Sequence, residues 1–192
     1  MLIEEIAKKR STIRNFHERD VDFEDILKIL EVARQAPSGM NTQPWRFIIV
    51  KDKGVKKKIR EACEEAEMRF HPKVAKWMRD WLSERGITPV KPYLTEAPYL
   101  IVVCVDETEP YSKESVWLAV GYMLLMTKEL GLGTVTYHPS STAKVREILD
   151  IPGSYAIETI LPVGHPAGEK KKEERRNLED LAYKDRWGTS LS

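Results

Sequence analysis

The chain has 192 residues, of which 42% are hydrophobic, enough to build a sizeable buried core in one domain. Charged residues are abundant but nearly balanced, with a formal net charge of +1, so composition gives no reason to expect nucleic acid or an anionic membrane as a partner. No apolar run approaches the roughly 20 residues that span a bilayer, the N-terminus lacks the apolar core of a signal peptide, and the two cysteines form no CxxC pair; we therefore expect a cytoplasmic protein without a metal site.

Two helices and a strand are predicted before residue 51. Residues 2–9 have the composition of a short helix, and Asp22 is the expected N-cap of a second one, whose apolar residues recur at helical spacing. That helix ends before Ala36-Pro37-Ser38-Gly39, since proline disfavours helix in the residue before it and Ser-Gly favours a turn. The run from Trp45 to Val50 is aromatic and β-branched, which predicts a strand.

Residues 54–86 are charged and helical in character, with a break at His71-Pro72 and an end at Gly86. Trp77 and Trp81 lie four residues apart, on one side of this stretch. An aromatic stripe of this kind normally packs on the body of its own domain. The other interpretation is a lid over a substrate pocket, so we expect a helical excursion at about 54–96 whose role stays open.

Three further strands are predicted at residues 99–105, 133–137 and 156–163, with helices at 113–130 and 142–149. The strands are not separated by regular single helices, which favours an α+β fold over a doubly wound sheet. The helix at 113–130 is apolar around nearly its whole circumference, so it must be buried in a large core or against a second subunit. For a chain of this size the second option is attractive.

Two segments carry residue types suited to a planar ligand with a phosphate. Arg10-Ser11-Thr12-Ile13-Arg14 places two guanidinium groups beside two hydroxyls, a set that can cradle a phosphate; an exposed basic turn is the alternative. In the loop from Pro37 to Trp45, Asn41 and Gln43 offer amide groups to the polar edge of a heterocycle; the alternative is an ordinary helix-to-strand connection. Gly131-Leu132-Gly133 leaves a helix and enters a strand, the reverse of a dinucleotide fingerprint.

In this order and spacing the segments resemble the nitroreductase family, whose signatures are matched by Arg10 to Phe16 and by Ala36 to Val50. The resemblance covers nearly the whole chain and continues through Ala97-Pro98, Gly131-Leu132-Gly133, the run from Leu161 to Pro166, and Arg175-Arg176. It implies a single nitroreductase domain over 1–192, with a mixed, mainly antiparallel sheet flanked by helices, an intertwined homodimer and a C-terminal tail from about residue 166.

The resemblance also implies FMN in clefts built from both subunits. Arg10, Ser11, Thr12 and Arg14 would hold the phosphate, the ribityl chain and part of the ring edge, while Pro37, Ser38, Gly39 and Asn41 would reach the site from the other subunit. Val135, Thr136 and Tyr137 would line the flavin with backbone groups, Gly164 would lie close by, and Arg175 and Arg176 would complete the phosphate site. Two departures stand out: Ser11 replaces a second basic residue, and Pro139 has no amide N–H to donate.

The function implied is that of an oxidoreductase in which the flavin carries the chemistry and no side chain acts as acid or base. NADH or NADPH would reduce FMN, and a nitro-aromatic, quinone or related small-molecule acceptor would then take the electrons in a ping-pong cycle, with Arg14 stabilising the reduced flavin. Relatives that carry out reductive dehalogenation, enone reduction or flavin fragmentation are the alternative. A non-enzymatic binding protein using Lys170 to Arg176 is a distant one, because acids dilute this basic run and no aromatic residues are interleaved.

Overall fold

The computed structural model describes residues 2–168 and 170–191. Its four strands form one sheet in the order β1-β2-β4-β3, and every neighbouring pair is antiparallel. The strands are Trp45–Val50 (β1), Tyr99–Asp106 (β2), Gly133–Thr134 (β3) and Tyr155–Gly164 (β4). Together with the flanking helices they confirm the α+β prediction, although the described strands pair only antiparallel where a mixed sheet was expected.

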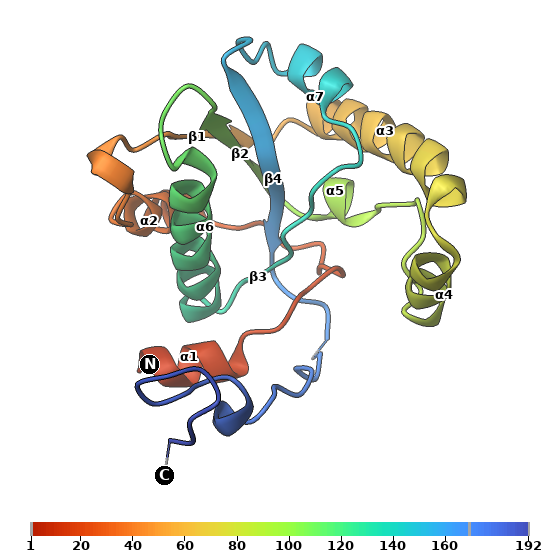
Figure 1. Cartoon of the computed structure of the whole chain (residues 1–192). Coiled ribbons are helices and arrows are strands. Elements are labelled where there is room, and N and C mark those ends of the chain that lie inside the picture. The colour runs from red at the N-terminus through yellow and green to blue at the C-terminus, as the bar shows by residue number, and fades with distance from the viewer. Residues whose placement is uncertain (1, 169, 192) are drawn as a thin grey trace.

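The helices form one layer on each face of the sheet (Figure 1). They are α1 (Ile3–Lys9), α2 (Phe23–Ala33), α3 (Lys53–Phe70), α4 (Lys76–Glu84), α5 (Tyr93–Glu96), α6 (Ser112–Glu129) and α7 (Ala143–Ile148). Short 3₁₀ turns are η1 (Gly39–Asn41), η2 (His71–Lys73) and η3 (Leu178–Asp180). Helices α2 and α6 cover one face, α3, α5 and α7 cover the other, and α4 projects from the end of α3.

Strand β2 is where the two layers meet. One set of its side chains packs with α2 and α6, namely Tyr99, Ile101, Val103 and Val105. The alternating set packs with α3, α5 and α7, namely Leu100, Val102 and Cys104. Successive side chains of a strand point to opposite faces, so a strand covered on both faces must be apolar throughout. This explains why residues 99–105 are an uninterrupted apolar run.

Helix α6 is covered by its own chain on one side only. Val116, Ala119 and Val120 are fully buried in the core, whereas Trp117 and Leu118 are 41% and 48% exposed. A single chain therefore buries only one side of this helix, although its apolar circumference predicted burial on all sides. None of the described helices is both long and apolar enough to cross a membrane.

Three elements differ from the sequence predictions. Trp77 and Trp81 are 68% and 45% exposed, and α4 buries none of its residues. The expectation that the aromatic stripe packs on the body of the domain is therefore wrong. The guanidinium group of Arg85 stacks on Trp81, 4.4 Å from its ring centre. The lid interpretation stays a prediction. The third strand ends at Thr134, and the chain rejoins β4 only through a bridge from Tyr137 to Ile160. The sequence predicts no separate helix between Gly86 and Tyr99, where α5 begins directly after Pro92.

Lys56 fastens α3 to the start of β2. Its Nζ donates to the carbonyl oxygens of Ala97 at 2.6 Å, Pro98 at 3.1 Å and Thr95 at 3.4 Å. Burial lowers the pKa of this lysine, which is only 5% exposed. A buried ammonium group with three carbonyl partners acts as a clamp, because each carbonyl would otherwise lack a donor.

Lys56→Met is expected to lower the free energy of unfolding by about 2 kcal/mol, because buried carbonyl oxygens lose a charged donor. Lys57→Met, at an exposed position of the same helix, is the matched control and should change stability by less than about 0.5 kcal/mol. Urea unfolding at equal protein concentration measures both. Equal midpoints for the two variants would show that the clamp does not stabilise the fold.

Candidate functional site

A basic pocket lies where α1 meets the C-terminal tail. Arg10 follows the last residue of α1, and its neighbours Ser11 and Thr12 line the pocket with it. The tail supplies the other walls, Lys170, Lys171, Lys172, Glu173 and Arg175. Burial, and then the nearby Arg175, lower the pKa of Arg10. Cations crowded around two hydroxyl side chains are the donor set that a phosphate group requires.

A larger cavity of about 760 Å³ adjoins this pocket and shares Arg10 and Ser11 with it. Ile13, Gly133 and Thr134 line it, together with the C-terminal half of α6. The hydroxyl oxygen of Thr134 is buried and has no hydrogen-bond partner among the described residues. Buried polar atoms are nearly always paired, so this hydroxyl has room for one further hydrogen bond at the wall of the cavity.

The loop predicted to contact the heterocycle lies elsewhere. Its residues lie in or directly before η1, namely Pro37, Ser38, Gly39 and Asn41. The amide of Gly39 donates to the hydroxyl of Ser115 near the start of α6. The basic pocket lies beyond the other end of α6, where Thr127 lines the adjoining cavity. Ser115 and Thr127 are separated by about 18 Å of helix at a rise of about 1.5 Å per residue. One chain therefore does not bring the two predicted halves of the site together.

The backbone of this loop is held in an uncommon conformation. Met40, Asn41 and Gln43 have positive φ angles of 52°, 57° and 48°. Residues other than glycine adopt such angles at a cost of order 1–3 kcal/mol, and they are found in turns and at functional sites. The loop shape is imposed locally, in part by the hydroxyl of Ser38, which accepts a hydrogen bond from the amide of Gln43.

A second polar cluster, absent from the sequence predictions, centres on Glu67 near the end of α3. One carboxylate oxygen, Oε1, accepts hydrogen bonds from the hydroxyl of Tyr137 at 3.0 Å and from the amide of Ser140 at 3.1 Å. The other, Oε2, lies 3.2 Å from Nε2 of His71 and 3.8 Å from Nζ of Lys91. The side chains of Glu67 and Lys91 are only 8% and 5% exposed. The cluster is thus a buried pair of opposite charges.

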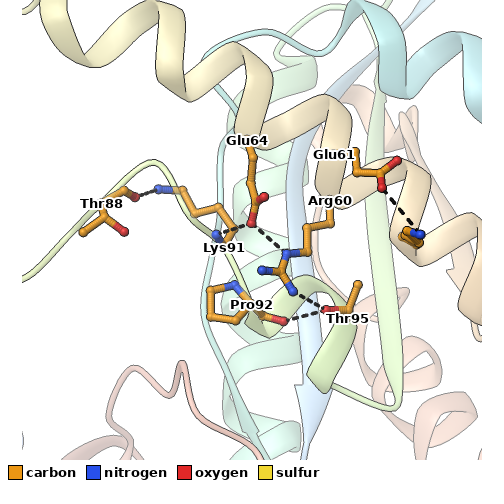
Figure 2. A network of polar contacts seen from close by, with 8 residues as sticks. Arg60, Glu61, Glu64, Thr88, Lys91, Pro92 and Thr95 are labelled. Carbon is orange, nitrogen blue, oxygen red and sulfur yellow. Dashed lines mark hydrogen bonds and ion pairs between the residues drawn. The ribbon is translucent and has the colours of Figure 1, made fainter.

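Lys91 is held in place by a network between α3 and the loop before α5 (Figure 2). Oε1 of Glu64 accepts from the backbone amide of Lys91 at 2.7 Å and from Nε of Arg60 at 2.7 Å. Arg60 in turn donates to the hydroxyl of Thr95 in α5, and the Lys91 ammonium group donates to the carbonyl of Thr88. The loop therefore presents Lys91 to Glu67 from a fixed backbone position.

Arg14 connects this cluster with the basic segment. Burial lowers the pKa of Lys91, the Glu67 carboxylate opposes that shift, and the charge of Arg14 adds to it. Burial raises the pKa of Tyr93, and here the charge of Arg14 opposes the shift. Arg14 is therefore close enough for its charge to act on both groups. Arg10 and Ser11, from the same segment, line the phosphate-type pocket.

The other predicted residues divide between the site and the fold. The backbone N–H and carbonyl of Tyr137, which were expected to line the flavin, both pair with Ile160. In the same segment Val135 is buried and Thr136 is exposed. Gly164 is needed for packing, since a Cβ there would lie 2.8 Å from Phe16. Arg176 is exposed and does not line the pocket that contains Arg175.

Known proteins resemble this chain over most of its length. The model described as "Nitroreductase family" matches residues 7–165. An iodotyrosine deiodinase of Thermotoga neapolitana is 45% identical over 177 residues, covering 92% of this chain and 95% of the relative; one of Haliscomenobacter hydrossis is 35% identical over 190 residues, covering 92% and 82%. The crystal structure of an oxidized iodotyrosine deiodinase bound to FMN and 3-iodo-L-tyrosine superposes with a TM-score of 0.89 at 45% identity, covering 92% of this chain and 96% of that one.

Arg10→Ala is expected to weaken FMN binding about 30-fold, because the phosphate loses a charge-assisted partner. Riboflavin has the same ring and no phosphate, so its affinity should change less than about 2-fold. Titration of the apoprotein with each flavin, followed by flavin fluorescence, measures both constants. Parallel losses for the two flavins would show that Arg10 does not bind the phosphate.

Proposed function

The chain belongs to the nitroreductase family, and from this premise we propose that it is an FMN-dependent reductive dehalogenase of 3-halogenated tyrosines, with NADH or NADPH as the source of electrons. In the reaction an aryl carbon–halogen bond breaks and an aryl C–H bond forms. Two electrons and one proton are consumed, and a halide ion leaves. Reduction of nitro-aromatics and quinones, the activity first expected from the family resemblance, has family-level support only, whereas the relatives named above favour dehalogenation.

The buried Glu67–Lys91 pair carries this proposal. An α-amino acid has an ammonium and a carboxylate group on one carbon, and the cluster offers one partner for each. The distance of 3.8 Å between Oε2 of Glu67 and Nζ of Lys91 is too long for a direct hydrogen bond, so the two charged groups do not bond directly to each other. A buried ion pair adds little to stability by itself. Nitro-aromatic and quinone acceptors have no charges for these groups to bind, so ligand recognition gives the pair a role that such acceptors do not.

The residues around the basic pocket fit FMN. Arg10, Thr12 and Arg175 suit the phosphate, and the orphaned hydroxyl of Thr134 suits a ribityl hydroxyl. Ser11 lies between these two regions and lines both cavities. When bound, FMN supplies the two electrons of the reaction. Arg14 would then lie between the flavin and the Glu67 cluster, where its positive charge favours an anionic ligand on either side.

The protein's own residues have separate tasks in this proposal. Glu67 binds the substrate ammonium group, and Lys91 binds the substrate carboxylate. These two contacts hold the amino-acid end of the substrate. They thereby fix the distance of the halogenated ring from α3 and its orientation. The exposed tryptophans of α4 are suited to cover the substrate and exclude water, which is the lid role left open by the sequence.

A homodimer would complete the site. The η1 loop and the basic pocket lie at opposite ends of α6, and an antiparallel partner helix would place the loop of one subunit beside the pocket of the other. The exposed side of α6 is suited to that contact, since Trp117, Leu118 and Tyr122 are 41%, 48% and 38% exposed. Met40 at the loop tip and Tyr111 before α6 extend the same apolar surface.

The reduced, FMN-loaded protein is expected to convert 3-iodo-L-tyrosine to tyrosine and iodide in equal amounts, as measured by chromatography and an iodide electrode. Glu67→Gln should lower kcat/KM about 100-fold, because the ammonium group loses its charged partner. Glu65→Gln, at an exposed position of the same helix, should stay within about 2-fold of the wild type. Reduction of nitro-aromatics without any iodide release would overturn the proposal.

Leu118→Arg is expected to give monomers that bind FMN at least about 30-fold more weakly, because two charged groups would face each other in the apolar contact. Ala143→Arg introduces the same cation at an exposed position of α7 and should leave the molar mass and the FMN affinity unchanged. Light scattering and flavin titration give the two quantities. A monomer that still binds FMN normally would show that one chain holds the complete site.

A further inference from the structure

Tyr137 is held rigidly between the sheet and the excursion. Its backbone pairs with Ile160 in both directions, and its carbonyl also accepts from the hydroxyl of Thr159 at 3.1 Å. Its ring meets that of Tyr93 edge to face, with 5.8 Å between centres and 76° between planes. The side chain is 7% exposed, so the hydroxyl has little freedom to choose another partner. That partner is Oε1 of Glu67.

This hydroxyl decides which carboxylate oxygen of Glu67 faces Lys91 and His71. Burial, followed by the neighbouring Cys63 and Glu67, raises the pKa of Tyr137, so its hydroxyl stays protonated and remains a donor. Together with the amide of Ser140 it occupies Oε1 with two donors. Oε2 is thereby turned toward Lys91 and His71. A glutamate on a helix end otherwise samples several rotamers, and ordering it for a ligand reduces affinity.

We propose that Tyr137 is a positioning residue for amino-acid recognition: its hydroxyl holds the Glu67 carboxylate so that Oε2 faces the substrate ammonium group. The inference rests on the proposed function. Because Thr136, its neighbour, belongs to the segment expected beside the flavin, Tyr137 also ties the amino-acid end of the site to the cofactor end. The predicted consequence is selectivity for ligands that carry the α-ammonium group.

Tyr137→Phe separates this role from simple packing, since the ring is kept and only the hydroxyl is lost. The dissociation constant of 3-iodo-L-tyrosine should rise about 10-fold. That of 3-(3-iodo-4-hydroxyphenyl)propanoic acid, which has the carboxylate but no amine, should change less than about 2-fold. Tyr93→Phe removes a hydroxyl from the facing ring, and both constants should stay within about 2-fold. Quenching of the bound flavin's fluorescence measures all of them on FMN-loaded protein.

Two further readouts make the test decisive. Tyr137→Phe should raise KM and leave kcat at saturation within about 2-fold, as expected for an effect on binding. In the Glu67→Gln background, Tyr137→Phe should cause no additional loss, because a residue acting through Glu67 has nothing left to position. Equal weakening of both ligands, or full additivity with Glu67→Gln, would overturn the inference. If the wild type itself fails to prefer the amino acid over the deaminated acid, the proposed function fails as well.

Discussion

The burial of β2 on both faces is the constraint on which the rest of the structure depends. Its seven residues from Tyr99 to Val105 are all buried, with α2 and α6 on one side and α3, α5 and α7 on the other. A single strand thereby sets the order of the layers. It directs one side of α6 into the core and leaves the other side outside. It also brings the start of α3 against α5, where Lys56 closes the contact.

The polar chemistry lies at the margins of these layers. Beyond the C-terminal end of α6 the basic residues that follow α1 and those of the tail form a pocket suited to an anion, and near the end of α3 the Glu67 cluster buries one group of each charge. Arg14, from the basic segment, is close enough to the Glu67 cluster for its charge to act on Lys91. This spacing of charges is compatible with two ligands, a cofactor with a phosphate at the basic pocket and an amino acid at the Glu67 cluster. In the proposed dimer, the exposed apolar side of α6 forms the contact between subunits, and the η1 loop of the second subunit completes the site.

In the proposed function, the helical excursion at about 54–96 determines which electron acceptor the enzyme selects. The cofactor-side residues have the same chemistry whichever acceptor is reduced, and they carry no information on the acceptor. Glu67 and Lys91 do carry it, because burying two charges that are 3.8 Å apart favours a ligand that can pair with both. Tyr137 and the Glu64 network hold these two groups from opposite sides.

The sequence by itself determined most of the helices and strands, the fold class and the basic segment at Arg10 to Arg14, because helical spacing, β-branched runs and caps act over a few residues. It did not reveal the Glu67 cluster. In a helix as charged as α3 a buried glutamate looks like its exposed neighbours, and His71 and Lys91 lie in separate elements. It also favoured packing for Trp77 and Trp81, which are exposed, and a flavin contact for the backbone of Tyr137, which pairs with Ile160. Only the tertiary structure decided these points, because burial and pairing are set by residues distant in the chain.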